Sequence, residues 1–185
     1  MRAPARRRLR PPTWQGTALN MARLVAMLLI TILLQSTLAP HVRMLGASPD
    51  FALIAVVCVG LVRGSETGAL FGFVTGTWVS VAVFGPLGVS SLVLVLVGYF
   101  AGRYAETADP TSGLAPIVVV AVGTGLAEIM YALAQFLLGR QAPFGFFFVH
   151  ALLPELVLNA LLAAPGYLLA RLWLREAVSH GARTA

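Results

Sequence analysis

Charged residues are scarce in this chain: only 11% of its 185 residues are Asp, Glu, Lys or Arg, whereas 58% are hydrophobic. A soluble domain of this length does not carry so little charge, so the apolar runs must face lipid. Lysine is absent, all thirteen basic residues are arginine, and the three histidines are scattered. The basic charge is therefore interpreted as a determinant of membrane topology, and no nucleic-acid-binding surface is expected.

Cysteine occurs once, as Cys58 within an apolar run, which excludes an internal disulfide and a cysteine-based metal site. The P-loop, HExxH and GxSxG patterns are also missing. A serine–histidine pair would have to join Ser90 or Ser91 to His150, and nothing nearby in the sequence activates either serine. The sequence therefore predicts a protein that is not an enzyme and that has no cofactor and no metal site.

Six apolar runs divide the chain into predicted membrane crossings. They cover residues 24–39, 51–62, 67–84, 89–102, 114–138 and 146–170. The second run is too short to cross about 30 Å of hydrocarbon without its flanks, so we expect it to be tilted or partly re-entrant. The prediction is an all-α bundle of six transmembrane helices at 21–175, with a disordered, arginine-rich cytoplasmic tail at 1–20 and a cytoplasmic tail at 176–185.

The distribution of arginine predicts the orientation of the bundle. If the N-terminus is inside, eleven arginines lie on the inner side, and only Arg43 and Arg140 lie in outer loops. Because positive charge is retained on the cytoplasmic side, both termini are expected in the cytoplasm.

Small residues recur at four-residue spacing in the third run and again near the end of the fourth. The predicted helix-packing positions are Gly68, Gly72, Gly76, Ser80, Gly98 and Gly102. In lipid, such a stripe lets two helix backbones approach closely. We expect the other spans to pack around the helix of the third run, and we expect Gly98 and Gly102 to offer an exposed stripe to a partner helix.

Two acidic residues lie inside the predicted spans, where charge is costly. Glu128 is in the outer half of the fifth span, Glu155 is at a similar depth in the sixth, and Asn159 follows Glu155 by one turn. One interpretation is a pocket that binds an ion, a proton or a ligand. The other is a hydrogen-bonded clamp between helices, with one or both glutamates protonated, and it is favoured because no third ionisable group completes a relay in these spans.

Short motifs follow one another in a characteristic order, most clearly between residues 34 and 103. They comprise Gln35 and Pro40 in the run LQSTLAP, Pro49 and Asp50 before the second span, Arg63 and Gly64 at its end, Phe73 in the third span, and Gly85 and Gly88 in the turn after it. Together they resemble the family of the rod shape-determining protein MreD. The sequence departs from that family at Ser80, where many members carry Asp, so a role for an acid there does not carry over.

The resemblance implies a non-enzymatic scaffold of the bacterial cell-elongation machinery in the cytoplasmic membrane. Members of the family work with the bitopic periplasmic protein MreC. Through it they work with the actin-like filament MreB and with the elongation glycosyltransferase and transpeptidase that build the lateral peptidoglycan wall.

The family is also similar in helical layout to the substrate-binding components of energy-coupling-factor vitamin transporters. This similarity implies an alternative function, a substrate-binding membrane subunit of a vitamin or small-molecule transporter, with Glu128, Glu155 and Asn159 lining its pocket. Such a subunit needs an outer cavity with several convergent polar groups, whereas a scaffold should tolerate Gln at both acids.

Overall fold

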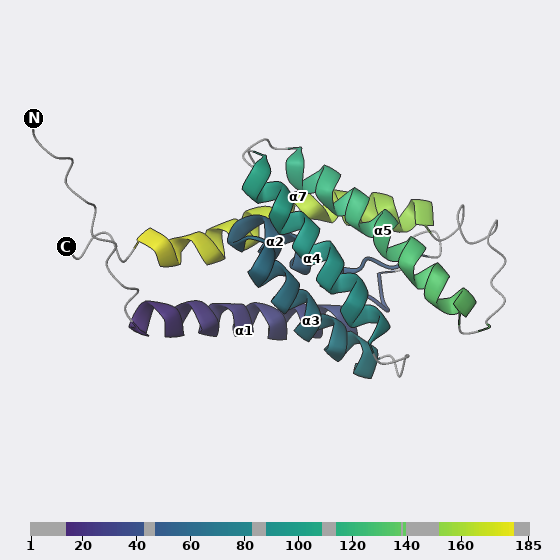
Figure 1. Cartoon of the computed structure of the whole chain (residues 1–185), viewed down its shortest axis with the longest axis horizontal. Coiled ribbons are helices and arrows are strands. Elements are labelled where there is room, and N and C mark those ends of the chain that lie inside the picture. The colour runs from purple at the N-terminus through teal and green to yellow at the C-terminus, as the bar shows by residue number, and fades with distance from the viewer. Residues whose placement is uncertain are drawn as a thin grey trace, which may run out of the picture.

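Six α-helices account for most of the chain that the structure, a computed structural model, describes (Figure 1). The described residues are 14–42, 47–82, 88–108, 114–137, 139 and 152–179. The helices are α1 (Trp14–Thr37), α2 (Phe51–Arg63), α3 (Ser65–Ala82), α4 (Val89–Thr107), α5 (Ala115–Leu137) and α7 (Leu153–Ser179). The predicted all-helical architecture is confirmed. The helix α1 begins before the predicted start of the bundle at residue 21, and α7 continues past its predicted end at 175.

Four of the described helices are long and apolar enough to cross a membrane. Their apolar segments are Asn20–Thr37, Val89–Thr107, Ala115–Leu137 and Leu153–Leu174. The helix α2 is apolar but has only 13 residues, which gives a length of about 20 Å. Since the hydrocarbon core is about 30 Å thick, α2 does not span it as a helix, in agreement with the short second run in the sequence.

The helix α2 lies at the centre of the bundle, because it contacts each of the other five described helices. Every residue from Ala52 to Leu61 is buried. The helix α3 packs instead on α1, α2 and α4 and exposes Leu70, Phe73 and Trp78 on its other side. The expectation that the other spans pack around the glycine-rich helix is therefore wrong. A helix that is apolar on all sides belongs in the interior, whereas the small residues of α3 follow only one side.

Glycines bring α3 and α4 into backbone contact. A Cβ atom added at Gly68 would lie 2.5 Å from the carbonyl oxygen of Gly98, and one added at Gly76 would lie 2.5 Å from the Cα atom of Ser91. A Cβ atom at Gly72 would collide with the backbone of Leu94. No side chain fits at these three positions unless the two helices move apart.

The stripe of Gly98 and Gly102 is covered within the molecule. Gly98 packs against the backbone of Gly68, and Gly102 packs against the backbone of Ser65. Both glycines are buried, so the expectation that they offer an exposed stripe to a partner helix is wrong. Ser80 is buried at the other end of α3, and its hydroxyl has no hydrogen-bond partner.

A single residue, Gly64, connects α2 to α3. Its φ of 90° and ψ of 178° lie in a region of backbone conformation that is essentially restricted to glycine. The first residue of α3, Ser65, donates its backbone N–H and its hydroxyl to Oε1 of Glu106 on α4, at 2.9 and 2.7 Å. Arg103 donates to the other oxygen of the same carboxylate at 3.0 Å. The turn at one end of the bundle is thus attached to α4.

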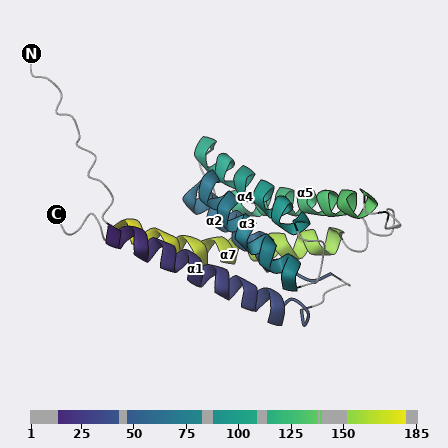
Figure 2. The ribbon, with the colours of Figure 1, turned by 60° about the horizontal axis from the view of Figure 1, so that its bottom comes forward.

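The N-terminal end of α1 and the C-terminal end of α7 lie at this same end of the molecule (Figures 1 and 2). Arg63 at the end of α2 donates to Oδ1 of Asn20 on α1 at 3.1 Å. Arg23 on α1 donates to the carbonyl oxygen of Trp173 on α7 at 3.1 Å. Arginines from three helices therefore gather at the end of the bundle that contains the α2–α3 turn.

Candidate functional site: a polar cluster at the buried start of α2

The helix α2 begins inside the protein, next to the fully buried Pro49. The first N–H groups of any helix have no partner within the helix and need acceptors from elsewhere. Asp50 is the N-cap residue, and its Oδ1 accepts the N–H of Leu53 at 3.0 Å. Aspartate is among the residues that best supply this bond.

Two further caps come from other helices. Oε1 of Gln35 on α1 accepts the N–H of Ala52 at 3.2 Å, and Oδ1 of Asn159 on α7 accepts the N–H of Asp50 at 2.9 Å. An unpaired backbone group at membrane depth costs several kcal/mol. The three side chains together therefore allow a helix that is too short to span the hydrocarbon core to start within the bundle.

Asn159 also connects α7 to α5. Its Nδ2 donates to Oγ1 of Thr124 at 3.2 Å, and both side chains are completely buried. One turn from each of these residues, the half-buried carboxyl groups of Glu128 on α5 and Glu155 on α7 lie close enough to interact with each other. The structure thus brings together all three polar residues that the sequence singled out. They lie on the facing sides of the antiparallel helices α5 and α7.

The carboxyl group of Asp50 lies close enough to both glutamates to interact with them electrostatically, so the expectation that no third ionisable group accompanies them is wrong. Among the described residues, however, no group of three His, Cys, Asp or Glu side chains is arranged to hold a metal ion. The cluster therefore offers backbone caps, one amide bridge and one pair of carboxyl groups as its chemistry.

The remaining predicted positions are spread over the molecule. Pro40 is exposed after α1 and Phe73 is exposed on α3. Gly88 adopts a φ of 101° just before α4. Gly85 and His150 lie outside the described residues. These positions do not join the cluster.

Sequence analysis missed two features of the site, the caps from Asp50 and Gln35, and one contact at the α2–α3 turn. The capping role of Asp50 had a signal, since an aspartate directly before an apolar run is a typical helix start. The cap from Gln35 and the attachment of Ser65 to Glu106 had none, because each joins residues from different helices whose packing is not visible in a single sequence.

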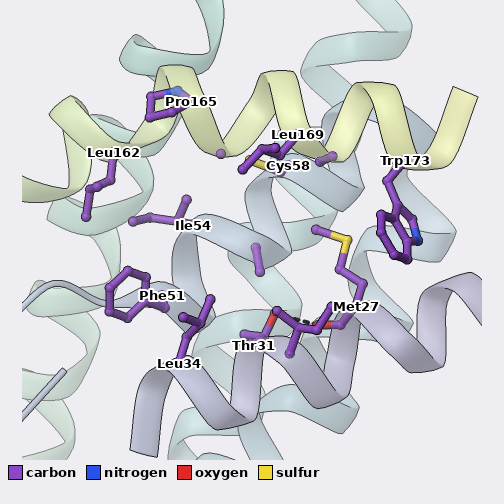
Figure 3. A pocket seen from close by; sticks show the side chains of 14 residues that line it. Met27, Thr31, Leu34, Phe51, Ile54, Cys58, Leu162, Pro165, Leu169 and Trp173 are labelled. Carbon is purple, nitrogen blue, oxygen red and sulfur yellow. Dashed lines mark hydrogen bonds between the residues drawn. The ribbon is translucent and has the colours of Figure 1, made fainter. Parts of the chain in front are cut away.

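A lateral groove lies beside the cluster, between α1 and α7, with α2 as its floor (Figure 3). Its volume is about 400 Å³. It is lined by Met27, Ile30, Thr31, Leu34, Phe51, Ile54, Ala55, Cys58, Leu162, Pro165, Gly166, Leu169, Ala170 and Trp173. None of the polar residues Glu128, Glu155 and Asn159 lies in its wall.

The four membrane-length helices, packed around a short buried helix whose polar start is capped from within, define an integral membrane protein with several crossings. The family model described as rod shape-determining protein MreD matches residues 15–177, and the chain belongs to that family. No curated protein and no solved structure matches the chain.

Membership of the family confirms the resemblance drawn from the sequence motifs and assigns the protein a role in determining rod shape. The likeness in layout to energy-coupling-factor components stays a prediction.

Proposed function

We propose that the protein is a non-enzymatic scaffold of the cell-elongation machinery. In this role it binds MreC in the cytoplasmic membrane and, through MreC, couples MreB filaments to lateral peptidoglycan synthesis by the elongation glycosyltransferase and transpeptidase. The observation that carries the proposal is the family match, which extends from the first turn of α1 to the last turn of α7 and so includes every described helix.

The hydrogen bonds of the polar cluster favour a scaffold over a substrate-binding subunit. The amide of Asn159 uses its oxygen on the backbone of Asp50 and its nitrogen on Thr124. The side-chain oxygen of Gln35 is used on Ala52. These hydrogen bonds hold four helices together, so both amides contribute to packing between helices. A binding site would instead need several polar groups that converge on a cavity.

The proposed topology has six crossings, the second made by α2 together with its flanking residues, and both termini in the cytoplasm. Arg23, Arg63 and Arg103 gather at one end of the bundle, and the positive-inside rule assigns that end to the cytoplasm. In this arrangement α2 and α3 form one of the hairpins, the α2–α3 turn is cytoplasmic and the polar cluster lies in the outer half of the membrane.

The test is affinity purification of the tagged chain from its own host in mild detergent, followed by mass spectrometry of proteins and small molecules. We expect MreC and wall-synthesis enzymes to be recovered without a stoichiometric metabolite. The variants Glu128→Gln and Glu155→Gln should recover the same partners, since glutamine keeps the shape of the side chain and can still form hydrogen bonds between the helices.

The alternative gives a different result in the same experiment. A transporter subunit would be recovered with ATPase subunits and a vitamin-like molecule, and the glutamine variants would lose that molecule. The close pair of carboxyl groups on α5 and α7 is the observation that favours this second function. Recovery of such a ligand with the wild-type chain would refute the scaffold.

A further inference from the structure

The groove between α1 and α7 is suited to an apolar occupant. Thr31 carries the hydroxyl in its wall, and that hydroxyl already donates to the carbonyl oxygen of Met27 at 2.8 Å (Figure 3). Ile30 and Leu169 line the groove and are 46% and 68% exposed, so it opens sideways from the bundle. In a membrane that opening faces the lipid.

The size of the groove matches one acyl chain. It extends along α7 from Leu162 to Trp173 (Figure 3), which corresponds to about 16 Å at 1.5 Å per residue. Half of a hydrocarbon core of about 30 Å is the depth of one leaflet. The groove has a volume of about 400 Å³.

Two arginines lie together at the end of the groove at Trp173. Arg23 donates to the carbonyl oxygen of Trp173, and Arg63 reaches the carbonyl oxygen of Leu174 at 3.5 Å. The two guanidinium groups are close enough to repel each other. Among the residues whose side chains the structure describes, which on α7 end at Leu174, neither arginine is paired with an acidic side chain, and the buried Nε of Arg63 has no hydrogen-bond partner.

We propose that this groove binds one anionic glycerophospholipid of the inner leaflet, with an acyl chain between α1 and α7 and the phosphate on Arg23 and Arg63. A phosphate supplies negative charge and acceptor oxygens for the remaining N–H groups of the two guanidinium groups. The placement in the inner leaflet rests on the orientation given under the proposed function. The binding of the lipid does not depend on MreC.

The test is native mass spectrometry of the full chain in detergent, titrated with phosphatidylglycerol or with phosphatidylcholine of the same acyl chains. We expect one tightly bound phosphatidylglycerol and weaker binding of phosphatidylcholine. Arg23→Gln and Arg63→Gln should each weaken phosphatidylglycerol binding about fivefold, the equivalent of about 1 kcal/mol per arginine near an anionic lipid. Ala55→Phe, which places a ring in the floor of the groove, should weaken the binding of both lipids.

The matched control is Arg103→Gln, which removes one arginine from the same end of the bundle, where it already pairs with Glu106. It should leave lipid binding unchanged. Equal binding of the two lipids by the wild-type chain, or an equal loss with Arg103→Gln, would overturn the proposal. If Arg63→Gln does not fold, Arg23→Gln and Ala55→Phe decide the question.

Recovery of MreC is scored separately. Loss of the lipid with MreC retained in the arginine variants supports the groove as a lipid site. If Ala55→Phe abolishes recovery of MreC while lipid binding is unaffected, the groove contacts a partner helix and the lipid proposal is wrong. If the wild-type chain binds lipid but MreC is never recovered with it, the scaffold proposal is wrong and the lipid proposal is supported.

Discussion

One methyl group added at Gly72 tests whether contact between the backbones of α3 and α4 holds the two helices together. In Gly72→Ala the new Cβ would lie 2.6 Å from the carbonyl carbon of Leu94 and 3.0 Å from the backbone nitrogen of Val95, and it would collide with the carbonyl oxygen of Leu94. All three atoms belong to the backbone of α4 and cannot rotate away. The helices must therefore separate to admit the methyl group.

The expected cost follows from two opposing effects. Overpacking costs about 1–3 kcal/mol, and we expect the upper end because no flexible side chain can yield. Alanine is favoured over glycine within a helix by about 1 kcal/mol, which offsets part of that cost. The net loss in the free energy of unfolding is therefore about 2 kcal/mol.

Gly125→Ala on α5 is the matched control, because a Cβ atom there would meet nothing within 4 Å. This variant gains the helix preference of alanine without a collision, so it should be neutral or more stable by up to about 1 kcal/mol. The two substitutions are chemically identical, but Gly72→Ala should lower the free energy of unfolding and Gly125→Ala should leave it unchanged or raise it.

The assay is thermal unfolding of the purified variants in one mild detergent. Unfolding is monitored as the loss of the monodisperse peak in size-exclusion chromatography. For a chain of this size about 1 kcal/mol corresponds to about 2–4 °C in the midpoint, so Gly72→Ala should fall by about 4–8 °C. A midpoint for Gly72→Ala equal to or above that of Gly125→Ala would refute the close-contact reasoning.

Three further substitutions can be checked by the same unfolding assay. Gly64→Ala forces a φ of 90° on a residue with a side chain and should cost about 1–3 kcal/mol. Glu106→Ala removes both hydrogen bonds to Ser65, so it should lower the midpoint more than Arg103→Gln, which removes only an exposed ion pair; equal midpoints would contradict this role. Asn159→Leu leaves buried groups of Asp50 and Thr124 without partners, at about 1–3 kcal/mol for each orphaned group; a stability equal to wild type would show that the bridge is dispensable.

Local features of the fold could be predicted from the sequence because they depend on neighbouring residues. The glycine spacing in α3 indicated a smooth helix face, and the structure packs that face against α4. Arg63 and Gly64 indicated a tight turn, and Gly64 has a backbone conformation that favours glycine. The positions of Glu128, Glu155 and Asn159 in their helices indicated facing side chains, and the structure brings the three together.

The central position of α2 could not be predicted, because an apolar residue looks the same in the sequence whether it faces lipid or protein. Hydrophobic burial, which distinguishes the inside from the outside of a soluble protein, does not separate these two surroundings in a membrane. The short length of α2 was the one available indication. A helix of 13 residues ends within the bilayer, so other helices must shield its free backbone groups from lipid.

The short length of α2 explains which residues of the polar cluster the fold requires. A buried helix start needs acceptors for its free N–H groups, and Gln35, Asp50 and Asn159 supply them. The bridge from Asn159 to Thr124 fixes the capping amide in place. Glu128 and Glu155 cap no backbone group in the described hydrogen bonds, so the start of α2 does not explain why two carboxyl groups are kept inside the membrane. If the glutamine variants of both acids retain stability and partners, the pair is an interhelical clamp; if they retain stability and lose a partner or a ligand, the pair belongs to the working surface of the protein.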